Sequence, residues 1–339
     1  MIIPTYNEAE NISELIPRIR SALKEIAHEI IVVDDSSPDN TAEVARELGA
    51  IVHVRPKKMG LATAFLDGLK IAQGRYVCLM DADLQHPPEV LPQMLSEAIR
   101  GADIVVASRY VEGGGTEGWS WIRKLISRGA RLIAYILIPE TRGVRDPVSG
   151  MFMVKRDVLN GVVFSPRGYK ILLEILVKAR YGKVVEVPYV FKRRLRGESK
   201  LDVGEIFNYL KLLLDLTNYR TLKFMVVGAS GIFVNQGVLS MLIELYKYSH
   251  WLASPLAIET ATLSNFVLND RWTFRGRWSG NIAVRCLKYH LSVAVGNIVN
   301  YLVYLGLVDV GLHYVAANLI GIALGFVANY VLSEVVVWR

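Results

Sequence analysis

RYVCLMDADLQHPP, residues 75–88, joins a short apolar run directly to a cluster of acidic residues. Residues 75–80 of this stretch are typical of a buried β-strand. Further β-branched or apolar runs occupy residues 29–33, 50–54 and 102–107, and amphipathic helical patterns separate the runs at about residues 9–26, 40–48, 60–73 and 88–100. Strands that alternate with helices in this way predict a doubly wound α/β fold with a mostly parallel sheet.

The start of the chain has the pattern of the end of a strand. Polar residues follow this strand and two of the others where each ends: PTYNE at 4–8, DDSS at 34–37 and DADLQ at 81–85. The carboxyl ends of parallel strands meet at one edge of a sheet, where such folds bind their ligands. Clustered carboxylates repel one another unless a cation lies among them. Oxygen ligands at alternate positions, as in Asp81-x-Asp83-x-Gln85, suit Mg²⁺ or Mn²⁺ shared with a diphosphate. We therefore expect a divalent-cation site at this edge.

The sequence contains no glycine-rich phosphate-binding loop of either common type. Residues 113–115 are three glycines, but no Lys-Ser or Lys-Thr pair follows them, and they are typical of a flexible loop. This pattern disfavours a P-loop nucleotide hydrolase and a dehydrogenase. No histidine stands out as a catalytic base, because His86 precedes two prolines and is expected to lie in a turn.

The charge density of the chain falls sharply near residue 221. Residues 1–221 contain 58 charged residues and residues 222–339 contain 13, in a chain of 339 residues that is 52% hydrophobic with a formal charge of +7. This composition excludes intrinsic disorder. Four apolar stretches follow the change, at roughly residues 222–245, 252–272, 288–309 and 313–338. Each approaches the ~20 helical residues that cross a bilayer core, which predicts a membrane region; a bundle of buried soluble helices is the alternative.

Basic residues gather between the second and third apolar stretches, at positions 271, 275, 277, 285 and 288. The other two connections are poor in cations, and basic connections remain in the cytoplasm. This pattern predicts that the connection, both chain ends and the polar part of the chain face the cytoplasm. The start of the chain, MIIPTYNE, lacks the features of a signal peptide.

Polar side chains also lie within the apolar stretches, where Glu259 is the ionisable candidate for a lipid headgroup path. Hydrogen bonding between helices is the alternative that we favour. Gly321 and Gly325 have the spacing that lets two membrane helices approach closely.

Two segments before the membrane region have the pattern of helices that lie in a membrane interface. Residues 119–138 combine an apolar stripe with four basic residues, after tryptophans at positions 119 and 121. Residues 203–218 present a second apolar face and lead into the first membrane stretch. An ordinary surface helix packed on the sheet is the alternative for residues 119–138.

PTYNE at 4–8, VDDS at 33–36, DADLQHPP at 81–88 and RLRGESKL at 194–201 occur in this order within residues 1–205. Together they resemble the motifs of inverting GT-A glycosyltransferases and, more narrowly, of dolichol-phosphate (polyprenyl-phosphate) mannose synthases. The asparagine-containing apolar stretches resemble a GtrA-like membrane domain. The resemblance implies a GT-A fold, a GDP-mannose donor, a divalent metal and a membrane-embedded polyprenyl phosphate acceptor.

The resemblance also implies roles for individual residues. The residues that would hold the guanosine of the donor are Pro4, Tyr6, Glu8, Val33 and Asp35. Asp81 and Ala82 would face the ribose and the diphosphate. The metal ligands would be Asp83 and Gln85, and the residues that contact phosphates would be Arg109, Arg194 and Lys200.

The acceptor in this family is a phosphate monoester, whose second pKa of about 6 makes it anionic near neutral pH. A side-chain general base is therefore not required. Arg123 and Ser127 lie one helical turn apart, and they are candidates for binding this phosphate together with Arg109 and Arg194.

We therefore expect a metal-dependent, inverting transfer of mannose from GDP-mannose to dolichyl or another polyprenyl phosphate at the cytoplasmic membrane face. The expected catalytic residues are Asp83, Arg109, Arg123, Ser127 and Arg194. The expected domains are a GT-A domain over residues 1–202, an interfacial helix and linker over 203–219, and a four-helix transmembrane domain over 220–339. The oligomeric state is left open.

Other functions compete with this expectation. A polyprenyl-phosphate glucosyltransferase that uses UDP-glucose would share much of the acidic motif set, and a lipid-linked sugar flippase would make the polar part of the chain regulatory. A polysaccharide synthase would need a second acidic cluster and a Gln-x-x-Arg-Trp motif, and the sequence has neither. The basic run at 192–200 lacks an aromatic platform, which disfavours nucleic acid as a partner.

Overall fold

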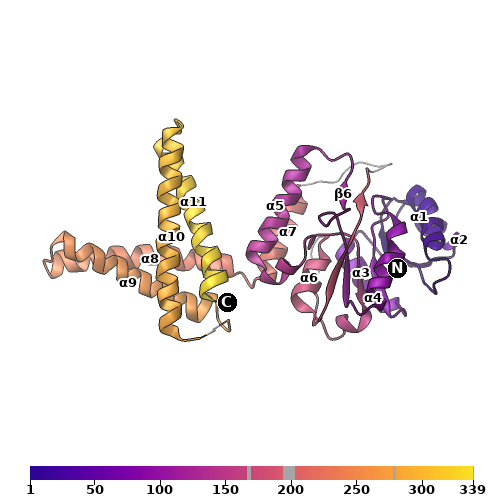
Figure 1. Ribbon diagram of the computed structural model, residues 1–339, viewed down its shortest axis with the longest axis horizontal. Coiled ribbons are helices and arrows are strands. Elements are labelled where there is room, and N and C mark those ends of the chain that lie inside the picture. Colours follow the sequence, from indigo (N-terminus) through magenta and orange to yellow (C-terminus); the bar gives the residue numbers. More distant parts are fainter. Residues whose placement is uncertain (166–168, 194–202, 278–279, 339) are drawn as a thin grey trace. The chain divides into compact units, whose positions relative to one another are not determined.

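The computed structural model describes residues 1–165, 169–193, 203–277 and 280–338. The chain divides into two units, Met1–Leu216 and Thr217–Arg339. The first unit is an α/β structure and the second is helical (Figure 1).

Within the described residues, the first unit is built on a seven-stranded sheet with the strand order β3-β2-β1-β4-β7-β5-β8. Its strands are β1 (Ile2–Thr5), β2 (Ile31–Asp34), β3 (Ile51–Val54), β4 (Tyr76–Leu79), β5 (Ile104–Ser108), β7 (Phe152–Lys155) and β8 (Val184–Pro188). β7 runs antiparallel to both of its neighbours, and the other pairs are parallel. The predicted mostly parallel sheet is confirmed.

Helices cover both faces of this sheet, so that its central strands are buried on both sides. One hydrophobic core contains side chains of α1 (Ala9–Ala22), α2 (Thr41–Glu47) and α4 (Leu91–Ile99). The other contains side chains of α3 (Leu61–Ile71) and α6 (Ile171–Lys178). In α1 the buried residues recur at helical spacing, at Ile12, Leu15, Ile16 and Ile19. Short 3₁₀ turns occupy Pro88–Val90, Pro139–Gly143 and Arg156–Leu159.

Two further helices of the first unit leave apolar side chains exposed. α5 (Trp121–Leu137) and α7 (Val203–Leu216) are joined by a hydrogen bond of 2.6 Å from the Tyr209 hydroxyl to the Ala130 carbonyl oxygen. The exposed apolar residues of the two helices are Trp121, Ile122, Leu125, Ile126, Leu132, Ile133, Ile206, Phe207 and Leu210. Both segments therefore have the amphipathic pattern expected from the sequence.

A second, two-stranded pairing in the first unit joins β6 (Gly115–Thr116) with β9 (Val190–Phe191).

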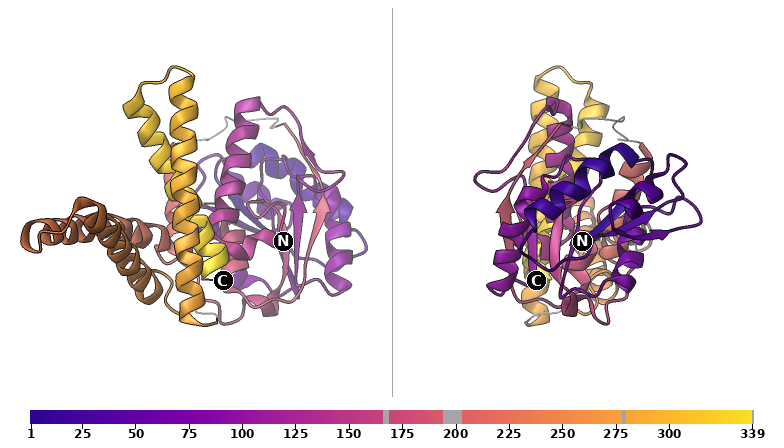
Figure 2. Two further views of the ribbon diagram at one scale, coloured as in Figure 1. Left: turned by 60° about the vertical axis from the view of Figure 1, so that its left-hand side comes forward. Right: turned by 90° about the vertical axis from the view of Figure 1, so that its right-hand side faces the viewer.

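In the part of the second unit that the structure describes there are four long helices: α8 (Arg220–Ser240), α9 (His250–Leu268), α10 (Ile282–Asp309) and α11 (Tyr314–Leu332). π-Helical turns extend α8, α9 and α11 over Met241–Leu245, Asn269–Thr273 and Ser333–Val337. α8 lies beside α9, and α10 lies beside α11 (Figure 2).

Among the described residues, three helical segments are long and apolar enough to cross a membrane: Arg220–Leu245, Ile282–Asp309 and Tyr314–Val337. The remaining long helix, α9, is not in this group. It corresponds to the stretch at 252–272, one of the four that the sequence predicted for the membrane region, and Glu259, Thr260 and Asn265 reduce its apolar character.

Small residues and polar contacts hold the helices of the second unit together. A Cβ on Gly325 would lie 2.6 Å from the Gly296 carbonyl oxygen, so α10 and α11 approach backbone to backbone, as the glycine spacing predicted. Glu259 Oε1 lies 3.0 Å from His290 Nε2 across α9 and α10, which is an interhelical contact of the favoured kind.

Candidate active site

The carboxyl ends of β1, β2 and β4 lie together because these three strands are adjacent and parallel. β1 aligns with β2 from Ile2 opposite Ile31 to Thr5 opposite Asp34. The segments that leave this edge of the sheet are 6–8, 35–37 and 81–85. The parallel sheet thus brings together the three acidic segments that the sequence predicted to meet.

Asp34 builds the turn after β2. Its carboxylate accepts hydrogen bonds from the Thr5 hydroxyl (2.8 Å), the Ser37 backbone N–H (2.8 Å) and the Ser37 hydroxyl (2.6 Å). Asp34 is 1% exposed. Its side chain is therefore committed to holding β1 and β2 in register at their ends.

Asp35, the next residue, organises the loop after β3. Its carboxylate pairs with the buried guanidinium of Arg55 and accepts hydrogen bonds from the backbone N–H groups of Met59 (3.1 Å) and Gly60 (3.3 Å). The Lys58 ammonium of the same loop lies 4.6 Å from the ring centroid of Tyr6. Asp35 and Tyr6, two predicted donor-binding residues, therefore meet at this loop. Sequence reasoning did not find Arg55, although it directly follows β3 at the same sheet edge.

Other predicted donor residues differ in what they offer a ligand. The side chains of Val33 and Ala82 are 0% and 3% exposed and belong to the hydrophobic cores, so only their backbone atoms are placed to meet a donor. Pro4 lies half-buried in β1. Glu8 directly precedes α1, and its backbone N–H donates to the Thr41 hydroxyl (3.0 Å).

The predicted metal-binding segment forms a tight turn after β4. Asp83 Oδ1 accepts a hydrogen bond from the Gln85 backbone N–H (3.1 Å), and Leu84 between them has φ of 59°. Gln85 Nε2 donates to the Lys192 carbonyl oxygen (3.0 Å), while the Lys192 N–H donates to the Gln85 carbonyl oxygen (2.9 Å). The turn is therefore tied to the strand that enters the predicted basic loop.

A hydrophobic and aromatic layer supports this turn from inside. His86 is 1% exposed, stacks on Tyr189 with ring centroids 5.5 Å apart and meets the edge of Phe191 at 5.1 Å. Burial, assisted by the nearby charges of Arg109 and Lys170, lowers the pKa of His86 to about 3. His86 is thus a neutral, buried ring that supports the acidic turn.

Gly150 makes room for the same turn. A Cβ at position 150 would lie 2.9 Å from Asp81 Oδ2 and 3.3 Å from His86 Cε1. A larger residue would push the Asp81 carboxylate from its position.

Arg109, which follows β5, is held by a residue that sequence reasoning missed. Its Nε and Nη2 each donate to the Asp146 carboxylate at 2.7 Å, and its backbone N–H donates to Asp146 Oδ2 at 3.1 Å. Burial opposes the charge of Arg109, but the hydrogen bonds and the charge of Asp146 raise its pKa above the ordinary value. The Nη1 atom of Arg109 takes no part in the pairing with Asp146.

The first turns of α5 lie close to Arg109. Arg123 and Arg109 both contact the ring of Trp119, and the Ser127 hydroxyl lies 2.8 Å from the Tyr110 hydroxyl. Three of the four predicted acceptor residues, Arg109, Arg123 and Ser127, are therefore connected through Trp119 and Tyr110. The fourth, Arg194, lies outside the described residues, as does Lys200.

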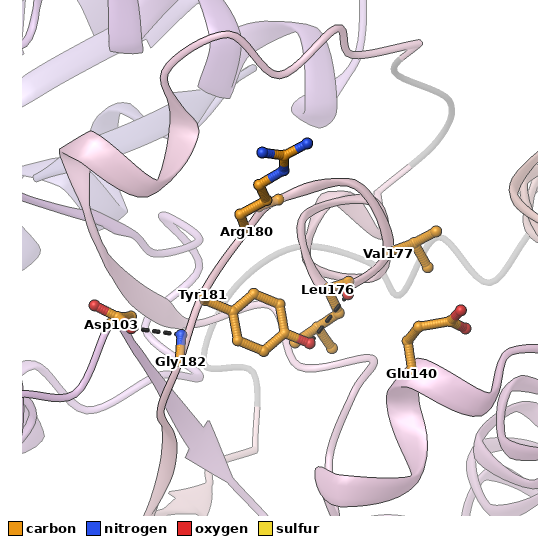
Figure 3. Close-up of a pocket in the computed structure, with 8 residues that line it drawn as sticks. Asp103, Glu140, Leu176, Val177, Arg180, Tyr181 and Gly182 are labelled. Atoms are coloured by element: carbon orange, nitrogen blue, oxygen red, sulfur yellow. Dashed lines mark hydrogen bonds between the residues drawn. The ribbon is translucent and has the colours of Figure 1, made fainter.

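A surface depression of about 660 Å³ lies at the opposite end of the sheet (Figure 3). On its wall Asp103 directly precedes β5 and Gly182 lies two residues before β8, and the Gly182 N–H donates to Asp103 Oδ2 (2.7 Å). None of the described residues predicted for the active site lines it. It is separate from the acidic edge.

Two family models match the chain. The model described as glycosyl transferase family 2 matches residues 1–162, and the model described as the GtrA/DPMS transmembrane domain matches residues 223–338. The second match and the three apolar helical segments found in the described residues make the chain a membrane protein.

The chain is similar to one named protein over its full length and to two others over part of it. A dolichol-phosphate mannosyltransferase of Pyrococcus furiosus is 46% identical over 100% of this chain and 98% of its own. Proteins of the same name from Mycosarcoma maydis and Saccharomyces cerevisiae are 34% and 36% identical, covering 76% and 64% of this chain and 89% and 85% of theirs.

A solved structure shares the fold of the first unit. Glucosyl-3-phosphoglycerate synthase from Mycobacterium tuberculosis, in complex with phosphoglyceric acid, matches with a TM-score of 0.51 at 23% identity, over 63% of this chain and 78% of that chain. The same enzyme with Mn²⁺ and UDP-glucose matches with a TM-score of 0.51 at 24% identity, over the same shares.

Proposed function

The chain belongs to the dolichol-phosphate mannosyltransferases, and from this membership we propose that it transfers mannose from GDP-mannose to dolichyl or another polyprenyl phosphate, with inversion at the anomeric carbon. One observation carries the proposal within the first unit. The acidic turn after β4 and the arginines of the predicted acceptor side are joined by packed side chains, from His86 through Phe191 to Arg109 and Arg123.

The donor occupies the carboxyl edge of β1, β2 and β4 in this proposal. Tyr6, Glu8 and Asp35 face the nucleoside end, and the backbone of Pro4 and Val33 completes that side. Asp35 contributes through its hydrogen bonds to Met59 and Gly60, since they hold the loop beside Tyr6 in one position. Asp81 and the backbone of Ala82 face the ribose and diphosphate.

The oxygen ligands that Asp83 and Gln85 offer fit Mg²⁺ or Mn²⁺. The described residues contain no group of three or more His, Cys, Asp or Glu side chains able to enclose a metal ion by themselves. Mg²⁺ commonly binds through one or two carboxylates together with substrate phosphates, so a sparse carboxylate set matches a cation shared with a diphosphate. Asp83 and the Oε1 atom of Gln85 would hold it. When bound, the cation would offset the negative charge that develops on the leaving nucleoside diphosphate.

The acceptor phosphate lies between Arg109, Arg123 and Ser127 in this proposal. The two guanidiniums neutralise the phosphate and orient its oxygen toward the anomeric carbon of the sugar. The phosphate is already an anionic nucleophile, since its second pKa is about 6. These side chains therefore supply position and charge.

The membrane arrangement follows from α5, α7 and the basic connection. The exposed apolar residues of α5 and α7 lie in the headgroup layer, where they bring the acceptor phosphate of a membrane lipid within reach. The connection from Arg271 to Lys288 lies on the cytoplasmic side with both chain ends. Within it Arg277 pairs with Glu334 and Arg285 with Asp270, so part of its charge also joins the helices of the second unit.

A parallel transfer assay tests the proposed function. The full-length protein in lipid nanodiscs receives GDP-mannose or UDP-glucose with Mn²⁺ and a short polyprenyl phosphate. We expect a mannosyl lipid from GDP-mannose and a rate at least about 10²-fold lower from UDP-glucose, corresponding to about 2.7 kcal/mol of discrimination. A glucosyl lipid as the main product, or no transfer from either donor, contradicts the proposal.

A further inference from the structure

Arg109 and Arg123 contact the same pair of aromatic rings. The Cζ atoms of Arg109 and Arg123 lie 5.5 and 4.6 Å from the ring centroid of Trp119. They lie 5.8 and 6.0 Å from the ring centroid of Phe191. Trp119 and Phe191 meet edge to face, with centroids 5.4 Å apart and an interplanar angle of 75°.

This arrangement solves an electrostatic difficulty of the acceptor side. Two guanidiniums that converge on one phosphate repel each other before the phosphate arrives, and Asp146 offsets the charge of Arg109 only. The negative face of an aromatic ring attracts a guanidinium and stacks well on its planar surface. A ring pair that both arginines contact therefore keeps them near each other without an anion, and removes part of the ordering cost of binding one.

The two arginines differ in burial. Arg109 is 8% exposed at its side chain and is paired with the fully buried Asp146. Arg123 lies in the first turn of α5 and is half-buried. Arg109 is therefore the more deeply buried of the two, and Asp146 fixes its orientation in addition to the rings.

The aromatic pair also connects the acceptor side to the acidic turn. Phe191 packs against His86, whose ring lies under the turn. The next residue, Lys192, exchanges two hydrogen bonds with Gln85. Trp119 and Phe191 thus stand between the two halves of the proposed site.

We propose that Trp119 is a positioning residue of the acceptor site, whose ring holds Arg109 and Arg123 at the separation that a phosphate monoester requires. This inference rests on the proposed function and deepens it. Trp119 acts on the phosphate only through the two arginines, which its aromatic ring contacts. Phe at this position also presents an aromatic ring, so it retains most of the affinity for the phosphate.

Direct binding of farnesyl phosphate to the full-length protein tests the role without requiring turnover. Trp119→Leu is expected to raise the Kd for farnesyl phosphate about tenfold, and Trp119→Phe less than about threefold. The matched control is Trp251→Leu, since Trp251 is 92% exposed in the second unit; its Kd should equal that of the wild type. The Kd for GDP-mannose should stay unchanged in Trp251→Leu and should change less than the Kd for farnesyl phosphate in the Trp119 variants.

A double variant separates positioning from a general loss of structure. Trp119→Leu with Arg123→Gln should lose less affinity than the product of the two single losses, because the ring acts partly through Arg123. If Trp119→Leu lowers the Tm, Trp119→Met takes its place in the same comparison.

Three outcomes overturn the positioning role: an unchanged Kd in the folded Leu variant, an equal loss in the Phe and Leu variants, or strictly multiplicative losses in the double variant. Absence of farnesyl phosphate binding by the wild type also overturns it. Wild-type binding without transfer from either nucleotide sugar contradicts only the proposed function.

Discussion

Arg109 and Asp146 form a two-pronged ion pair in which Nε and Nη2 each donate to the carboxylate at 2.7 Å. Their side chains are 8% and 0% exposed. The loop that carries Asp146 is fixed in turn, because Glu186 of β8 accepts the backbone N–H groups of Arg145 (2.7 Å) and Asp146 (2.9 Å). The orientation of Arg109 is therefore determined by the loop before β7, which carries Asp146, and by β8, which carries Glu186.

Asp146→Ala leaves the Arg109 charge buried without its partner. We expect the free energy of unfolding to fall by about 3–5 kcal/mol, as for other broken buried pairs, and the KM for polyprenyl phosphate to rise. Chemical denaturation in detergent and initial-rate kinetics measure the two effects. A free energy of unfolding within about 1 kcal/mol of the wild type would show that the pair contributes little.

Arg55→Lys tests the loop beside Tyr6. Arg55 is 2% exposed, and its guanidinium holds Asp35 and donates to the Thr63 hydroxyl (2.7 Å). Lysine keeps the charge and loses the planar fork. We expect the KM for GDP-mannose to rise about tenfold, or about 1.4 kcal/mol, with the acceptor KM unchanged. Equal donor KM values in variant and wild type would contradict this role.

The strands and acidic segments were predictable because short runs of apolar, β-branched residues, and the acidic residues that follow them, are local properties of the sequence. Arg55, Asp146 and Glu186 were not, since their partners lie 20 to 40 positions away and no motif marks them. The antiparallel direction of β7 is equally invisible to a hydrophobic pattern. His86 was expected in a turn because two prolines follow it. This local pattern does not indicate that the His86 ring packs against Tyr189 and Phe191.

The apolar face of α5 can be located by spin labelling. Leu125 is 61% exposed, and Lys124 beside it is exposed on another side of the helix. A nitroxide at Leu125→Cys is expected to collide more with oxygen, and one at Lys124→Cys more with a water-soluble nickel complex. Both are made in a Cys286→Ser background and measured by power saturation in nanodiscs. Equal accessibility to the nickel complex at the two positions would place α5 in water.

Cys78 is expected to be chemically inert in the folded protein. Burial raises the pKa of its thiol to about 12, so thiolate is scarce at pH 8. In a Cys286→Ser variant, a water-soluble disulfide reagent should react only after denaturation. Below pH 9 the thiol is protonated in both the folded and the unfolded chain. As the pH rises from 9 toward 12 the thiol ionises first in the unfolded chain, so the free energy of unfolding falls over this range. Rapid labelling of the folded variant at pH 8 would contradict the burial of this thiol.

The sharpest test of the acidic edge is the Mn²⁺ dependence of mannose transfer from GDP-mannose to a short polyprenyl phosphate, compared in the wild type, Asp83→Asn and Asp157→Asn. Asp157 is a matched control, because its side chain is 74% exposed. It follows the antiparallel β7 and therefore lies at the opposite end of the sheet from Asp83. We predict that Asp83→Asn loses transfer by about 10²–10³-fold or more with an unchanged Tm, and that Asp157→Asn titrates with Mn²⁺ like the wild type. Near-normal, Mn²⁺-dependent transfer by folded Asp83→Asn would contradict the account.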